Sequence, residues 1–168
     1  MRRTAPFLAV AAAATIALTA APAAAIEPYQ PDAMINPAMV GWVGQDVIGT
    51  DGADQEAYLG ITVGGVGDFE LAVENDGAFA DRFRFDGCAS SRGYKVRYVI
   101  GGESVTKAVR NGTFRSVVLS SGGVAGGLHL RVKATADAKP RILCDVVVSS
   151  SNAPAETDTV RARVELLP

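Results

Sequence analysis

The sequence predicts an all-β protein, a sandwich of antiparallel sheets. Three observations support this fold class. Apolar and polar residues alternate in short segments, Gly- and Asn-rich turns separate these segments, and no segment beyond residue 25 shows sustained helical spacing with caps. About eight such strands in a chain of 168 residues suit one domain of two sheets packed face to face.

The first 25 residues are not expected to belong to the fold. Met1, Arg2 and Arg3 give a positive start, residues 7–21 are apolar and uncharged, and three alanines end at Ala25. This pattern is typical of a signal peptide cleaved near Ala25. A retained anchor is the alternative, but the apolar stretch is short for a span of about 20 residues. We therefore expect a secreted chain, extracellular or associated with the cell envelope, with no membrane span after cleavage.

Charge is unevenly distributed along the rest of the chain. Residues 26–81 contain 11 acidic residues and no Lys or Arg, whereas residues 82–168 contain 14 basic and 7 acidic residues. Two domains of opposite charge would explain this asymmetry, and so would one domain in which acidic strands lie beside basic ones. Neither half is long enough to bury a good core alone. We expect one sandwich, in which 26–56 is an acidic segment with an edge strand and loops, and 57–168 is the remainder. Within this segment, the Gly- and Asp-rich run 41–56 is expected to form loops around the short edge strand.

The strands follow one another at turn-bounded intervals. In the segment 68–74, Phe69, Leu71 and Val73 alternate with polar residues, so one face is apolar and the other polar. The following Asn-Asp-Gly sequence, residues 75–77, tolerates the backbone of a tight turn. The same reasoning predicts strands at 57–63, 82–85, 94–100, 114–119, 128–134, 142–148 and 159–166, and a short helical turn at 106–109.

Two cysteines, Cys88 and Cys144, are the only thiols in the sequence. An even number of cysteines in an exported chain favours a disulfide. A bridge over this separation would stabilise the fold by roughly 4 kcal/mol on the chain-entropy model. Two buried free thiols or a redox pair are the alternatives, although the Cys-x-x-Cys pattern typical of redox pairs is absent.

Several short motifs, taken in order, resemble a known family. They lie at residues 30–35, 43–47, 73–77, 93–98, 105–106, 130–132 and 158–162. Together they resemble the cell-adhesion-related domains, which are immunoglobulin-like repeats of bacterial extracellular proteins. The resemblance implies an immunoglobulin-like antiparallel β-sandwich of about seven to nine strands. It also implies a module without catalytic residues, used in tandem or attached to enzymes. The cysteine pair is a departure from the family, and we also expect a single module in place of a tandem array.

The sequence offers no obvious catalytic centre. His129 is the only histidine, so a Ser-His-Asp triad or a multi-histidine metal site would have to include it. Alternation places His129 on the outward face of its strand with Arg131 and Lys133, and we expect a solvated surface side chain there. The net charge of −2 gives no support for nucleic-acid binding. We expect no enzyme activity and no cofactor apart from the calcium considered next.

Two features near residue 50 are candidates for binding. Acidic side chains in a Gly-containing loop can bind calcium, but their spacing does not match the EF-hand, and a solvated acidic loop is the alternative. The candidate ligands are Asp46, Asp51 and Asp54. Trp42, the only tryptophan, lies beside this loop and is either a ligand contact or a core residue.

A third candidate is a set of basic residues on outward strand faces. These could bind an anionic polymer, unless the acidic half of the chain neutralises them. They are Lys95, Arg97, Arg131, Lys133, Arg161 and Arg163.

These observations predict a secreted or cell-surface binding or adhesion module without catalytic activity. Its partner would be an extracellular protein or polysaccharide, which the sequence does not identify. A secreted protease inhibitor and an accessory subunit of an extracellular hydrolase are alternatives. An exported structural protein that self-associates through edge strands is a third.

Overall fold

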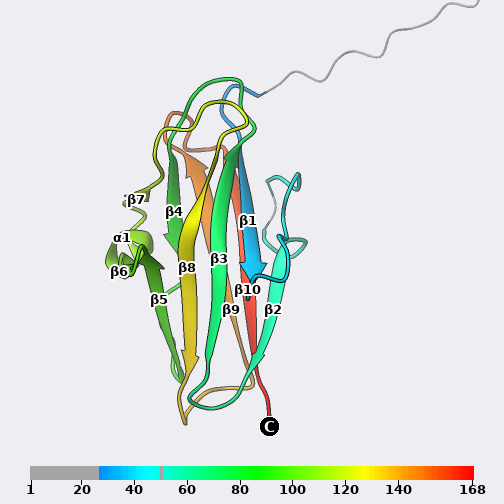
Figure 1. Ribbon diagram of the computed structural model, residues 1–168, viewed down its shortest axis with the longest axis vertical. Helices are drawn as coiled ribbons and strands as arrows, with labels where there is room; N and C mark the ends of the chain where they lie inside the picture. Colours follow the sequence, from blue (N-terminus) through cyan, green and yellow to red (C-terminus); the bar gives the residue numbers. More distant parts are fainter. Residues whose placement is uncertain (1–26, 50) are drawn as a thin grey trace, which may run out of the picture.

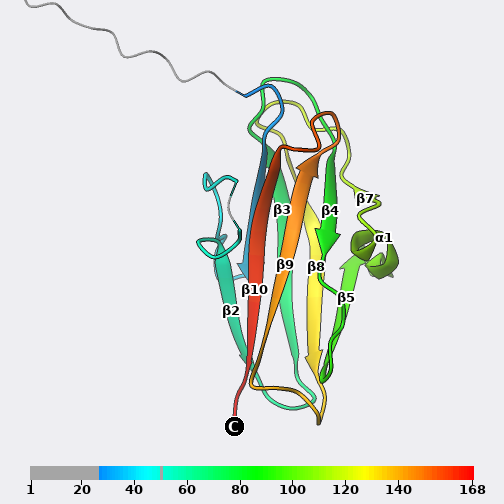
Figure 2. The same cartoon turned by 180° about the vertical axis from the view of Figure 1, so that it is seen from behind.

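The computed structural model describes residues 27–49 and 51–168, so the expected signal peptide, residues 1–25, lies outside the described residues. Two five-stranded sheets pack face to face, as Figures 1 and 2 show from opposite sides. The protein is an immunoglobulin-like β-sandwich, which confirms the fold class predicted from the alternating segments. No helix among the described residues has the length and apolar character needed to span a membrane.

The first sheet contains five strands paired in antiparallel fashion. Their order is β1 (Pro31–Pro37), β3 (Val66–Asn75), β8 (Val124–Ala134), β5 (Tyr94–Ile100) and β6 (Glu103–Ser104). The long central strands β3 and β8 match two of the segments with the clearest alternation in the sequence, although β8 begins earlier than expected. They form the middle of the layer nearer the viewer in Figure 1.

The second sheet is mixed rather than wholly antiparallel. Its order is β2 (Glu56–Ile61), β10 (Thr157–Leu166), β9 (Arg141–Ser150), β4 (Phe83–Gly87) and β7 (Phe114–Arg115). The chain crosses from the first sheet to the second between β1 and β2, and the edge strand β2 runs parallel to β10. The short helix α1 (Thr106–Arg110) confirms the helical turn expected at 106–109.

The described residues form eight strands of five or more residues and two strands of two residues. Seven of the eight longer strands match segments expected from the sequence, and the eighth, β1, was not among those segments. Segment 114–119, expected as one strand, is mostly irregular. Phe114 and Arg115 form the two-residue strand β7 beside β4, the Ser116 N–H donates to the Phe83 carbonyl oxygen, and Val117 and Val118 are exposed.

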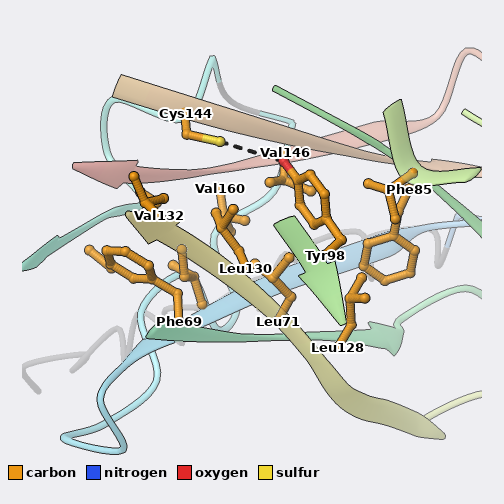
Figure 3. Close-up of a cluster of buried hydrophobic side chains, with 14 of the residues drawn as sticks. Phe69, Leu71, Phe85, Tyr98, Leu128, Leu130, Val132, Cys144, Val146 and Val160 are labelled. Carbon is orange, nitrogen blue, oxygen red and sulfur yellow. Dashed lines mark hydrogen bonds between the residues drawn. The ribbon is translucent and has the colours of Figure 1, made fainter. Parts of the chain in front are cut away.

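The core lies between the inward faces of the two sheets (Figure 3). Phe69, Leu71 and Val73 of β3 are almost completely buried, as the alternation predicted. They pack in one hydrophobic cluster with residues from the opposite sheet such as Val146 and Val160. Burial of apolar area at roughly 25 cal/mol per Å² is the main term that holds the two layers together.

A disulfide joins Cys88, just after β4, to Cys144 of β9, which confirms the predicted bridge. The buried hydroxyl of Tyr98 lies 3.5 Å from the Cys144 sulfur and donates to the Cys88 carbonyl oxygen at 3.3 Å. Figure 3 shows the Tyr98 ring reaching from β5 across the core toward Cys144. The bridge therefore joins two neighbouring strands of the second sheet, and the Tyr98 ring of the first sheet contacts it across the core.

The edge strand expected within the run 41–56 lies before it, because the edge strand of the acidic segment is β1. Among the described residues 41–49 and 51–55, only Val43 pairs, in an isolated bridge. The first six residues of β1 are all buried, although only Ala33 and Ile35 belong to the core. The chain after β1 folds back along the free edge of this strand, where Ile35 and Val43 form a bridge, and its N–H groups also contact the outward side chains of Asp32 and Asn36. Because both faces are covered, β1 lacks the polar–apolar alternation by which the other strands are recognised.

Candidate functional site

The connection between β1 and β2 exposes an unusual concentration of apolar side chains. We call residues 38–49 and 51–55 the β1–β2 loop. Met39 and Val40 are each 83% exposed and Trp42 is 41% exposed, so Trp42 is not a core residue. Val47 and Ile48 are also exposed, which places five large apolar residues at the surface within ten positions. A grouping of this kind is typical of an interaction surface, whereas single exposed apolar residues are not.

Hydrogen bonds and unusual backbone angles give the loop a defined shape. Ala38, Met39 and Asp46 have φ of 49°, 62° and 61°, a region that costs residues other than glycine roughly 1–2 kcal/mol. They are the only non-glycine residues in the described chain with positive φ. The Ala38 N–H donates to the Asp68 carbonyl oxygen, and the Gly41 N–H donates to Asn36 Oδ1. The loop is therefore an ordered part of the fold that presents its apolar side chains outward.

The buried carboxylate of Asp158 in β10 fixes the other end of the loop. Its Oδ2 accepts the Ala33 N–H of β1 at 2.7 Å. Its Oδ1 accepts Gln55 Nε2 at 2.7 Å, the Gly49 N–H at 3.2 Å and the Thr159 N–H at 2.8 Å. One side chain thus connects β1, β10 and two points of the loop, and charge-assisted hydrogen bonds of this kind are stronger than neutral ones.

Three carboxyl groups converge beside this loop. Asp32 of β1 pairs in register with Glu74 of β3, and Asp76 follows just after β3. Each residue contributes one carboxyl oxygen, and these three oxygens all lie within 4.8 Å of one another. We call these three residues the acidic cluster. The loop contributes the Asp46 N–H, which donates to Asp32 Oδ2 at 3.0 Å.

The environment of the acidic cluster disfavours negative charge. Asp32 is 0% exposed, and its Oδ1 is buried without a hydrogen-bond partner. Burial raises the pKa of Asp32 to about 7, helped by the neighbouring carboxylates of Asp76, Asp158 and Asp46 and opposed by the hydrogen bond from the Asp46 amide. Burial and acidic neighbours also raise the pKa values of Glu74 and Asp76. Within the described residues, no Lys, Arg or His forms an ion pair with the cluster.

Only one of the three calcium candidates named from the sequence lies beside this cluster. That residue is Asp46, whose amide contacts Asp32. Asp51 is exposed and accepts the Ala53 N–H at 2.9 Å, and Asp54 is exposed as well. The sequence did not identify Asp32 or Asp76 as ligands. Asp32 meets Glu74 and Asp76 only through the register of β1 on β3, and nothing in the sequence indicates that Asp32 pairs with a residue 42 positions further along the chain.

His129 lies on the outward face of β8, as alternation predicted. Its Nδ1 is 2.9 Å from Asp68 Oδ1, and Arg131 Nε donates to Asp68 Oδ2 at 3.0 Å. The side chains of His129 and Asp68 are each more than a third exposed. The structure thus places the single histidine in a surface pair with an acidic residue of β3.

The predicted set of outward basic residues divides between the two sheets. On the second sheet, Arg161 pairs with Asp145, and Arg163 pairs with Glu56 and Glu165. The first sheet has four cations on one groove of about 330 Å³, where like charges stand directly opposite each other on β5 and β8. They are Lys95 opposite Lys133 and Arg97 opposite Arg131, and we call them the cationic strip. Ion pairs among the described residues therefore involve both arginines on the second sheet, whereas in the cationic strip only Arg131 has such a partner, Asp68.

No protein-family model matches the chain, and no curated protein matches it. Several solved structures are similar to the chain. A family 123 glycoside hydrolase from Clostridium perfringens aligns over 82% of this chain with a TM-score of 0.52 and 9% identity. The alignment covers 27% of that enzyme, so this chain spans about a quarter of its length.

Two further solved structures align less closely. The secreted serine protease VesC from Vibrio cholerae aligns over 66% of this chain and 21% of its own, with 15% identity and a TM-score of 0.42. A PapD-like domain of human CEP192 aligns over 91% of this chain and 96% of its own, with 13% identity and a TM-score of 0.41. At these identities the likeness of the glycoside hydrolase concerns the fold alone.

Proposed function

We propose that the protein is a secreted immunoglobulin-like binding module without catalytic activity, which attaches to another protein through the β1–β2 loop. The observation that carries this proposal is the group of exposed apolar side chains on a hydrogen-bonded loop. Met39, Val40 and Trp42 would be the central contacts. Protein interfaces are enriched in Trp and Met, and a few buried anchors of this kind supply most of the binding energy.

The chemistry of the loop favours a protein over a polysaccharide. Sugars stack on flat aromatic rings, and the described part of the loop has one aromatic residue, Trp42, among aliphatic neighbours. Every charged residue of the loop is acidic. We therefore expect the partner to offer an apolar surface bordered by Lys or Arg, because complementary charges on the rim of an interface speed association.

Two features support a place outside the cytoplasm. The N-terminal sequence has the pattern of a signal peptide. The Cys88–Cys144 disulfide is the kind of bond that persists in oxidising compartments.

The proposal can be tested with the chain lacking residues 1–25. Immobilised wild-type protein is exposed to extracellular proteins and, separately, to envelope polysaccharides from the organism that produces it. The dissociation constant is then measured for each purified ligand. The test variant is Met39→Ser/Val40→Ser/Trp42→Ala. The matched control is Val117→Ser/Val118→Ser, which removes exposed apolar side chains elsewhere on the surface.

We expect a protein ligand whose affinity falls about tenfold or more in the loop variant and stays within about twofold in the control. An unchanged affinity in the loop variant, or retention of polysaccharide alone, would contradict the proposal. If the partner is an extracellular protease or hydrolase, its activity with and without the module distinguishes an inhibitor or an accessory subunit from an adhesion module.

A further inference from the structure

We propose that the acidic cluster of Asp32, Glu74 and Asp76 binds a calcium ion. This inference goes beyond the binding function and does not depend on it. It rests on the geometry of three oxygens, on one unpartnered buried oxygen, and on the charge around them.

The geometry suits a hard cation with oxygen ligands. Calcium binds oxygens at about 2.3–2.6 Å, so two oxygens on one ion lie at most about 5 Å apart. The three carboxyl oxygens of the cluster lie within 4.8 Å of one another. Asp32 and Glu74 stand opposite each other on neighbouring strands, so the sheet itself sets their separation.

The unpartnered oxygen of Asp32 points to a missing ligand. Buried polar atoms in folded proteins almost always have a hydrogen-bond partner. Asp32 Oδ2 accepts the Asp46 N–H, whereas Oδ1 has no partner although Asp32 is 0% exposed. An ion bound by the cluster would occupy this position and compensate the cost of burying an ionised carboxylate.

The local charge also favours a divalent cation. Three carboxyl groups lie together with Asp46 nearby, and the charged groups that raise their pKa values are all acidic. Protonation relieves such repulsion in the absence of metal, and Ca²⁺ relieves it while the carboxylates stay ionised.

The ligand set distinguishes calcium from other metals. Carboxylates without His or Cys suit calcium or magnesium rather than zinc. Magnesium demands near-ideal octahedral geometry at about 2.0–2.1 Å, whereas calcium accepts six to eight ligands in flexible arrangements. Three carboxylates completed by water suit calcium, with a dissociation constant of about 10⁻⁴–10⁻³ M, as in extracellular modules.

Binding of calcium would also affect the loop. The Asp46 amide donates to Asp32, so an ion on Asp32 would fix the base of the β1–β2 loop against the end of β3. Calcium should therefore slow hydrogen exchange in this part of the loop as well as raise the melting temperature of the fold.

The test uses calcium alone as the probe. Isothermal titration calorimetry and thermal unfolding are carried out on the chain lacking residues 1–25, in EDTA, in CaCl2 and in MgCl2 at matched ionic strength. At about ten times the dissociation constant, calcium should raise the melting temperature by about 3–6 °C. Magnesium should have a clearly smaller effect.

Two variants remove ligands and one serves as a control. Asp32→Asn should weaken calcium binding about tenfold or more, and in EDTA it should melt higher than wild type because an unpaired buried charge is gone. Glu74→Gln/Asp76→Asn should weaken binding equally without altering a fully buried residue. Asp51→Asn/Asp54→Asn, which removes exposed acidic residues of the same loop, should bind like wild type.

The absence of calcium binding by wild type up to about 10 mM would overturn the proposal, since that exceeds the expected dissociation constant at least tenfold. So would an equal loss of binding in the control and in the cluster variants. Neither outcome bears on the partner-binding test, which requires no metal.

Discussion

The carboxylate of Asp158 in β10 accepts the backbone N–H of Ala33 in β1 at 2.7 Å. This hydrogen bond joins the edge strand of one sheet to a strand of the other. The same carboxylate accepts donors from Gln55 and Gly49, so it also holds the end of the β1–β2 loop. The position of the loop therefore depends on one buried side chain more than 100 residues away in the sequence.

We expect Asp158→Asn to lower the free energy of unfolding by about 2–3 kcal/mol, because the new amide group would face N–H donors that lose their acceptor. Urea denaturation measures the change. The control is Asp145→Asn, which breaks a surface ion pair with Arg161 and should cost less than about 1 kcal/mol. Equal losses in the two variants would show that Asp158 has no special structural role.

Two glycines test how tightly the loop packs on β1. Gly44 has φ +101° and a Cβ there would lie 2.6 Å from the Ala33 carbonyl oxygen. Gly49 has φ +71° with no atom within 4 Å of such a Cβ. We expect Gly44→Ala to lower the free energy of unfolding by at least about 2 kcal/mol more than Gly49→Ala does. Gly49→Ala has mainly the unfavourable free energy of a non-glycine residue at positive φ, without a steric clash. Thermal unfolding of both variants checks this difference, and similar melting temperatures would contradict it.

The disulfide should contribute a large share of the stability. Cys88 and Cys144 are separated by 56 positions, and the chain-entropy model gives about 4 kcal/mol for a loop of this size. We expect Cys88→Ala/Cys144→Ala to lose about 3–5 kcal/mol in urea denaturation. A loss below about 1 kcal/mol would contradict this prediction and would mean that strand pairing and core packing hold β4 beside β9 without the bond.

The raised pKa of Tyr98 should make the stability of the fold sensitive to alkaline pH. Burial raises the pKa of Tyr98 well above the usual value of 10.0. Below pH 10 the phenol is protonated in both states and has no effect. Above pH 10 the unfolded state loses this proton first, so the free energy of unfolding falls by about 1.4 kcal/mol per pH unit.

Denaturation at about pH 9 and about pH 11 measures this fall, and Tyr98→Phe should reduce it. In Tyr98→Phe a smaller decrease in the free energy of unfolding should remain at high pH, because burial also raises the pKa of Tyr94. The exposed Tyr58→Phe serves as the matched control and should behave like wild type. An undiminished fall in Tyr98→Phe would contradict the prediction.

Alternation was sufficient to predict most of the sandwich from the sequence. Phe69, Leu71 and Val73 show why, because one face of β3 meets the core and the other meets water. The parallel pairing of β2 with β10 could not be predicted in this way, since alternation gives the face of a strand and not its neighbour. Strand β1 was hard to predict from the sequence because the loop covers its outer face and buries the polar residues Asp32 and Asn36.

The candidate site was harder to predict than the fold. Local sequence identified Trp42 and Asp46, which lie in the Gly-rich run itself. Asp32 and Asp76 became candidates only once β1 paired with β3, a contact across about 40 positions. A binding site that strand register assembles depends on tertiary contacts between distant segments. The local sequence pattern of each segment does not show which residues will meet.

The most direct test of the binding role is hydrogen exchange, measured by mass spectrometry, of the module free and bound to its protein partner. We predict that binding slows exchange most strongly in peptides covering residues 38–49. The cationic strip and the exposed residues Val117 and Val118 should exchange as in the free protein. Protection centred on either of those surfaces, with residues 38–49 unchanged, would contradict the assignment of the β1–β2 loop as the contact surface.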